Sequence, residues 1–147
     1  MKVINKIIAT SILTLVSASV LAQPIIDLYK SPTCGCCIKW SEIMKAEGYT
    51  VNYHHKEDWS SLKKEAGMPM ELQSCHTALI DGYLIEGHVP EQDVARLIAE
   101  KPENISGLAV PGMPRYSPGM AAKGQQYRGF NVVQFSSQGA ITVYQKY

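Results

Sequence analysis

Apolar and polar positions along the chain form short blocks that predict alternating strands and helices. An apolar run over residues 24–30 predicts a strand, and residues 36–47 then repeat apolar side chains at helical spacing up to Gly48. Residues 49–55 alternate apolar and polar positions, as expected for a strand. Asp58 follows as the N-cap of a short helix. The first half of the chain therefore reads strand, helix, strand, helix.

The pattern continues with a hairpin and a third helix. Residues 77–81 and 83–86 are apolar segments joined at Asp81-Gly82, a common hairpin turn. Pro90 then opens a helical pattern that Pro102 ends. The resulting order, β-α-β-α-β-β-α, is the thioredoxin-like order, so we predict an α/β fold in which helices cover a sheet.

The C-terminal part of the chain has a different composition. Residues 103–127 form a Gly/Pro/Met loop without periodicity, too long for a simple connection. Residues 128–147 alternate again around a Ser-Ser-Gln-Gly turn and predict a β-hairpin extension. Residues 23–147 are therefore interpreted as a single domain.

The first 22 residues have the pattern of a signal peptide. Lys2 and Lys6 precede an apolar core over residues 7–16, and Val20 and Ala22 occupy the −3 and −1 positions before a cleavage site. An uncleaved membrane anchor is the alternative, but the apolar core is short for a span. We expect a mature chain beginning at Gln23, exported to the periplasm and not stably inserted in the membrane.

The charge balance argues against polyanionic partners. Without residues 1–22 the chain has 12 basic and 13 acidic side chains and no basic run. A nucleic-acid or anionic-membrane partner is therefore not expected.

Three of the four cysteines lie where the first strand passes into the first helix. Cys34, Cys36 and Cys37 follow a Ser-Pro turn, and free backbone N–H groups at a helix start favour thiolate over thiol. Cys75 lies just before the third strand, which a thioredoxin-like arrangement places opposite that helix start. The spacing permits a Cys34–Cys37 disulfide or a bridge to Cys75, whereas bridges between the nearer neighbours would be strained.

Crowded thiolates support two kinds of chemistry. Soft sulfur ligands select Cu(I), zinc or iron–sulfur clusters. A structural zinc site usually takes its ligands from two well-separated cysteine pairs, whereas adjacent cysteines are better placed to bridge several copper ions. Zinc is therefore the less favoured metal. The alternative is a thiol–disulfide oxidoreductase with Cys34 as nucleophile and Cys37 as resolving thiol. A buried structural role is the ordinary alternative for Cys75.

Methionines and histidines extend the candidate metal site. Met113 and Met120 lie in Pro-Gly-Met turns, where a thioether can serve as a soft Cu(I) ligand, and His76 follows Cys75 directly. The alternative for the two methionines is core packing, and the alternative for His76 is a role without metal binding. The roles of five further residues are left open: His54, His55, His88, Met68 and Met70.

Several motifs in order resemble those of the CopG-type family. They are Cys34-Gly-Cys-Cys37, Leu72-Gln-Ser-Cys-His-Thr-Ala78, Gly82-Tyr-Leu-Ile-Glu-Gly-His-Val-Pro90 and Gly107-Leu-Ala-Val-Pro-Gly-Met-Pro114, followed by Ser117-Pro-Gly-Met120. The family consists of exported bacterial proteins of thioredoxin-like fold associated with copper resistance, formerly a domain of unknown function. The resemblance covers nearly all of the mature chain.

The resemblance implies a metal site and a function. It implies copper binding at Cys34, Cys36, Cys37 and Cys75, and a role in handling excess periplasmic copper alongside other copper-handling proteins. Binding of Cu(I) by four cysteines is the leading hypothesis. Cycling between Cu(I) and Cu(II), which would make the protein a copper oxidoreductase, is an additional hypothesis.

Overall fold

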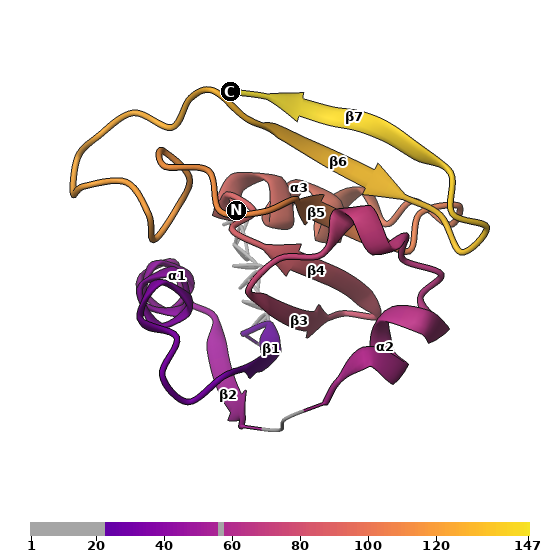
Figure 1. Ribbon diagram of the computed structural model, residues 1–147, viewed down its shortest axis with the longest axis horizontal. Coiled ribbons are helices and arrows are strands. Elements are labelled where there is room, and N and C mark those ends of the chain that lie inside the picture. Colours follow the sequence, from indigo (N-terminus) through magenta and orange to yellow (C-terminus); the bar gives the residue numbers. More distant parts are fainter. Residues whose placement is uncertain (1–22, 56–57) are drawn as a thin grey trace, which may run out of the picture.

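A computed structural model describes residues 23–55 and 58–147 as a mixed α/β structure built on one seven-stranded sheet. Figure 1 shows the sheet with its three helices. The elements are β1 (Ile25–Lys30), α1 (Gly35–Ala46), β2 (Thr50–His54), α2 (Ser60–Glu65), the 3-10 turn η1 (Met70–Leu72), β3 (His76–Ile80), β4 (Tyr83–Gly87), α3 (Glu91–Glu100), β5 (Gly107–Val110), β6 (Asn131–Phe135) and β7 (Ile141–Lys146).

The sheet order is β2-β1-β3-β4-β5-β6-β7. Strand β1 runs parallel to β2 and antiparallel to β3, and β3 and β4 form the predicted hairpin across Asp81-Gly82. β4 pairs in parallel with β5, and the hairpin β6–β7 continues the sheet in antiparallel fashion. The first seven helices and strands keep the predicted β-α-β-α-β-β-α order, which is consistent with a thioredoxin-like core.

Each face of the sheet has its own apolar core. Helices α1 and α3 cover one face, where Trp40 and Met44 pack with Val94 and Leu97 against the central strands. The segment from α2 to η1 covers the other face with a smaller cluster that includes Leu72 and residues of β4, β5 and β6. Packing in the first of these cores fixes the position of α1 relative to the sheet, and with it the position of its N-terminus.

One prediction stays untested and one is modified. The signal peptide over residues 1–22 lies outside the described residues. The loop predicted over 103–127 contains β5, which the sequence pattern did not reveal. All four residues of β5 are buried, so this strand lacks the apolar–polar alternation of a half-exposed strand. The C-terminal hairpin is present as predicted. Within the described residues, no helix is long and apolar enough to cross a bilayer.

Candidate metal centre

Strand register brings the two cysteine segments together. The last residue of β1, Lys30, pairs with the first residue of β3, His76. The chain leaving β1 toward Cys34 and the chain entering β3 from Cys75 therefore lie at the same end of the sheet. The buried Lys30 ammonium donates a hydrogen bond to the Ser31 carbonyl at 3.0 Å, and this contact helps to hold the turn before α1.

Cys34 is the N-cap of α1. Its extended backbone precedes the helix, and its Sγ accepts the backbone N–H of Cys37 at 3.3 Å, as an N-cap side chain does. Cys34 and Cys37 are joined in a disulfide, while Cys36 and Cys75 are free thiols. A site of four thiolates therefore requires reduction of this disulfide by two electrons.

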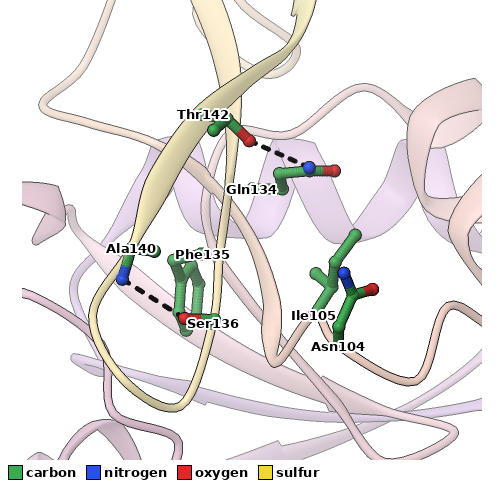
Figure 2. A pocket seen from close by; sticks show the side chains of 7 residues that line it. All are labelled: Asn104, Ile105, Gln134, Phe135, Ser136, Ala140 and Thr142. Carbon is green, nitrogen blue, oxygen red and sulfur yellow. Dashed lines mark hydrogen bonds between the residues drawn. The ribbon is translucent and has the colours of Figure 1, made fainter.

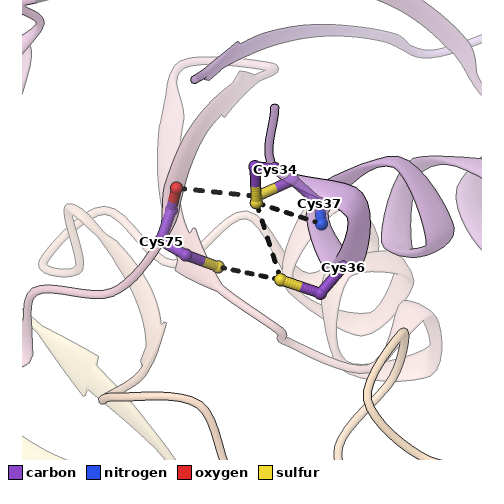
Figure 3. Close-up of side chains that lie close together, drawn as sticks. All are labelled: Cys34, Cys36, Cys37 and Cys75. Carbon is purple, nitrogen blue, oxygen red and sulfur yellow. Dashed lines mark hydrogen bonds between the residues drawn. A yellow bond between two sulfur atoms is a disulfide. The ribbon is translucent and has the colours of Figure 1, made fainter. Parts of the chain in front are cut away.

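All four sulfur atoms nevertheless lie in one place. Figure 3 shows the Cys75 side chain, carried by the loop before β3, pointing at Cys36 on the first turn of α1. Their Sγ atoms are 4.0 Å apart, and Cys36 Sγ is 3.5 Å from Cys34 Sγ. The four Sγ atoms lie within 4.8 Å of one another. The predicted meeting of Cys75 with the turn cysteines is therefore present in the structure.

His88 contacts Cys75 more closely than any other cluster residue does. The His88 Nε2 atom lies 2.9 Å from Cys75 Sγ, and its Nδ1 lies 2.6 Å from the Pro118 carbonyl oxygen. Because a carbonyl only accepts hydrogen bonds, Nδ1 carries the proton and Nε2 presents its lone pair to Cys75. Burial lowers the pKa of His88 below its usual value. The ring is therefore neutral, and its unprotonated Nε2 faces the cluster.

His76 is fully buried beside the cluster. Its Nδ1 is 3.5 Å from Cys75 Sγ, and its ring lies against Trp40 and edge-on to His88. Burial, and after it the neighbouring His88, holds the pKa of His76 well below its usual value. Its Nε2 makes no hydrogen bond of normal geometry within the described part of the chain. The nitrogen that lies against Cys75 is Nδ1, so this is the ring atom of His76 that could bind an ion at the cluster.

A buried carboxylate anchors the loop that carries Cys75. Glu86 on β4 accepts the Ser74 backbone N–H at 2.7 Å, the Thr77 hydroxyl at 2.6 Å and the Lys63 ammonium at 2.8 Å. Burial raises the pKa of Glu86, and the three donors oppose that rise. Glu86 therefore fixes the backbone on both sides of Cys75 and His76.

The two loop methionines lie in turns that contact the site through their backbones. The Ser74 hydroxyl donates to the Gly112 carbonyl beside Met113, and Gly119, beside Met120, packs on the first turn of α1. The side chains themselves are 56% exposed for Met113 and 37% for Met120.

The four remaining candidate methionines and histidines either pack against other residues or are exposed to solvent. Met68 is buried in the smaller core, and Met70 is 79% exposed. His54 hydrogen-bonds Asp27 at 2.8 Å, and His55 stacks on Tyr53. These four residues need no role in the cluster.

Comparison with known proteins identifies the family. Two solved structures named copper resistance protein CopG, form 1 and form 2, match with TM-scores of 0.77 and 0.76. Both are 37% identical to this chain and cover 86% of it, and the match spans 98% and 99% of the two structures. The chain belongs to the CopG family. A family model described as a protein of unknown function, DUF411, matches residues 72–120, and a search of curated proteins finds no match.

Within this CopG-family chain, His88 is the site residue whose importance the sequence pattern did not show. A single histidine before a helix carries little information, and only its hydrogen bond to Pro118 and its contact with Cys75 reveal it. The one feature of the sequence that pointed to His88 is its place in the motif Gly82-Tyr-Leu-Ile-Glu-Gly-His-Val-Pro90.

A pocket elsewhere on the molecule lacks this chemistry. Figure 2 shows it between the β6–β7 hairpin and Asn104–Ile105, with hydrogen bonds from Gln134 to Thr142 and from Ala140 to Ser136. Its lining contains no cysteine, histidine or methionine. The cysteine cluster is therefore the better candidate for a metal site.

Proposed function

We propose that this CopG-family protein is exported to the periplasm, where it binds Cu(I) through Cys34, Cys36, Cys37 and Cys75 and contributes to copper resistance. The observation that carries the proposal is the convergence of four Sγ atoms within 4.8 Å from two segments far apart in the sequence. Thiolates select Cu(I), and closely spaced thiolates bridge several Cu(I) ions more readily than they enclose one zinc ion.

The proposal also assigns supporting ligands. His76 lies against Cys75 Sγ, and the turns of Met113 and Met120 border the cluster, so these three residues supply imidazole and thioether donors. Cycling of the bound copper between Cu(I) and Cu(II), with the electron passing to an external one-electron acceptor, would make the protein a copper oxidoreductase. Other periplasmic copper-handling proteins are its proposed partners.

The test is an anaerobic Cu(I) titration of the reduced mature chain against a chromophoric Cu(I) chelator. We expect more than one Cu(I) per chain, with the stoichiometry falling when any one of the four cysteines is changed to serine. An unchanged stoichiometry across this set of variants would rule out the four-cysteine site. Zinc retained in protein purified without copper, with unfolding on chelation, would instead indicate a structural zinc module.

A second function has one specific observation in its favour. The Cys34–Cys37 disulfide, at the start of α1, has the C-x-x-C spacing of thiol–disulfide oxidoreductases. Against it, the free Cys36 thiol lies 3.5 Å from Cys34 Sγ and competes for a mixed disulfide. Rapid insulin reduction by metal-free protein, abolished by Cys37→Ser, would favour this function over copper binding.

A further inference from the structure

The C-terminal part of the chain carries only positively charged side chains. Residues 104–147 contain four basic side chains and no acidic one, whereas residues 23–103 contain 13 acidic and 8 basic side chains. The near-neutral balance of the whole mature chain conceals this asymmetry. Three of the four cations, Arg115, Lys123 and Arg128, lie in the loop between β5 and β6, which Figure 1 shows in orange beside α1. The positive charge is therefore gathered on one loop.

No carboxylate of the described residues neutralises these three cations. Arg115, Lys123 and Arg128 form no ion pair within the described part of the chain, whereas Arg96 and Lys101 each pair with a carboxylate there. The side chains of Arg115, Lys123 and Arg128 are all exposed. The loop therefore offers positive charge to a partner.

One tyrosine organises two of the cations. The guanidinium carbon of Arg128 lies 4.6 Å from the centre of the Tyr116 ring, and that of Arg115 lies 5.7 Å from the same ring. Stacking uses the flat face of a guanidinium and leaves the N–H groups at its edge free. Those N–H groups bind carboxylates in bidentate fashion. Arg115, Tyr116 and Arg128, called here the arginine–tyrosine group, therefore have the chemistry of a carboxylate-binding surface.

A hydrogen-bonded turn holds this group in place. The Ser117 backbone N–H donates to the Pro114 carbonyl at 3.0 Å, so Arg115 and Tyr116 occupy the two central positions of a turn. The Ser117 hydroxyl donates to the same carbonyl at 2.7 Å, and Ser117 is fully buried. A surface that is already ordered loses less entropy when a partner binds, so the turn favours recognition.

The same loop borders the cysteine cluster. The Pro118 carbonyl accepts a hydrogen bond from His88 at 2.6 Å, and Gly119 packs on the first turn of α1. Met113, which is 56% exposed, precedes Arg115 by two residues. A protein bound to the arginine–tyrosine group would therefore lie beside the loop that carries the proposed thioether ligands.

We propose that the arginine–tyrosine group, with Lys123 of the same loop, is the docking surface for an acidic protein that delivers Cu(I) to this chain. The inference rests on the proposed copper function and specifies the chemistry of the partner, which has a carboxylate-rich face beside its own copper-binding group.

Charge complementarity decides between the possible occupants. A loop with cations and no carboxylate attracts an acidic protein surface and repels a basic one. Arginine and tyrosine are also residue types enriched at protein interfaces. An anionic membrane is less favoured, because the mature chain as a whole contains more acidic than basic side chains and a bilayer would repel the rest of its surface.

The first test measures docking on metal-free protein by NMR. The isotope-labelled mature chain in its disulfide form is titrated with a peptide of six glutamates and two methionines. The matched probe carries glutamine at the six acidic positions. We expect amide shifts confined to residues 113–128, seen with the glutamate peptide only, and binding that weakens about tenfold between low and physiological ionic strength.

Two charge reversals decide the assignment. Arg128→Glu should weaken binding of the glutamate peptide at least about tenfold. Lys64→Glu, which makes the same change of charge at an exposed lysine on α2, should weaken it less than about twofold. Tyr116→Leu keeps both guanidinium charges and should cost about threefold through the lost stacking. Equal effects of the two reversals, or shifts centred outside residues 113–128, would overturn the proposal.

A second measurement follows Cu(I) delivery from each peptide to the reduced chain. The ion leaves peptide thioethers for protein thiolates without a change of oxidation state, and the thiols release their protons to solvent. Delivery from the glutamate peptide should be about tenfold faster than from the glutamine peptide, and Arg128→Glu should remove the difference. Equal delivery rates would overturn the proposal. Docking without Cu(I) uptake from either peptide would instead mark failure of the proposed copper function.

Other occupants give different results. Binding of the mature chain to phosphatidylglycerol vesicles, lost in Arg128→Glu, would overturn the proposal in favour of a membrane surface. Inorganic phosphate that saturates the same amide shifts and blocks the glutamate peptide would show a small-anion site instead. Salt-sensitive self-association in sedimentation, lost in the same variant, would show that the partner is a second copy of this chain.

Discussion

The backbone of Gly119 packs directly against the carbonyl oxygen of Cys36. A Cβ atom at position 119 would lie 2.8 Å from that oxygen and 2.9 Å from the Trp40 backbone nitrogen, and Gly119 has a positive φ of 81°. The same turn presents the Pro118 carbonyl to His88. This loop from the C-terminal part of the chain therefore contacts the cysteine-bearing helix and one imidazole at once, as the orange segment beside α1 in Figure 1 illustrates.

Gly119→Ala should separate this loop from the site. We expect the free energy of unfolding to fall by about 3 kcal/mol, because the new Cβ adds a backbone clash to the cost of a positive φ. Cu(I) affinity should fall because the loop that carries Met120 moves away from the cluster. Thermal unfolding and chelator competition measure the two effects.

Gly124→Ala is the matched control. Gly124 has a similar φ of 79°, but a Cβ atom at this position would have no other atom within 4 Å. Only the conformational cost of the positive φ, about 1 kcal/mol, should therefore appear. Equal effects of the two substitutions on copper affinity would show that loop packing on α1 is irrelevant to the site.

Copper binding should release a proton from Cys75. Burial, and after it the neighbouring Cys36, raises the pKa of the Cys75 thiol to about 12. The metal-free thiol is therefore protonated at neutral pH, and a metal ion that binds the thiolate must displace this proton. Affinity should rise with pH by about tenfold per unit for each proton released.

Proton release measured between pH 7 and 8 checks the prediction. The reduced wild-type chain should release one proton more per bound cluster than Cys75→Ser does. Identical release by the two proteins would mean that Cys75 does not bind the metal as a thiolate.

Glu86→Gln should loosen the loop that carries Cys75. The amide keeps an acceptor oxygen, but it loses the charge that faces the Lys63 ammonium and the Ser74 N–H. We expect a loss of about 1–3 kcal/mol of stability and a Cu(I) affinity lowered about tenfold. Calorimetry and chelator competition test both effects, with the exposed Glu103→Gln as control. Unaltered copper affinity in a destabilised Glu86→Gln protein would limit this carboxylate to a structural role.

Met120→Leu tests whether the loop thioether belongs to the site. If Met120 supplies a thioether ligand as proposed, leucine should preserve its apolar contacts but lower Cu(I) affinity about tenfold. Met70→Leu, at a more exposed methionine outside the Pro-Gly-Met turns, should have no effect. Equal affinities of the two variants would exclude Met120 as a ligand, and the same comparison applies to Met113.

Local sequence patterns were sufficient to predict most elements of the fold. Strand β1, helix α1 and the β3–β4 hairpin have strong periodicity and turn residues, so their order and approximate bounds follow from the chain. Strand β5 was missed because all of its residues are buried, which removes the alternation that identifies an edge or half-exposed strand.

The candidate site was only partly predictable for a different reason. The meeting of Cys75 with Cys36 follows from the thioredoxin-like order, because that order places the end of β1 beside the start of β3. The role of His88 depends on the carbonyl of Pro118, far along the chain, and a contact of that kind leaves no periodic signal in the sequence.

X-ray absorption at the copper edge of the reduced, Cu(I)-loaded chain tests the central claim most directly. We expect a first shell dominated by sulfur, with copper neighbours at short range, and a decrease in sulfur ligation in Cys75→Ser. A first shell of nitrogen and oxygen alone, or a spectrum that Cys75→Ser leaves unchanged, would contradict the assignment of copper to the four cysteines.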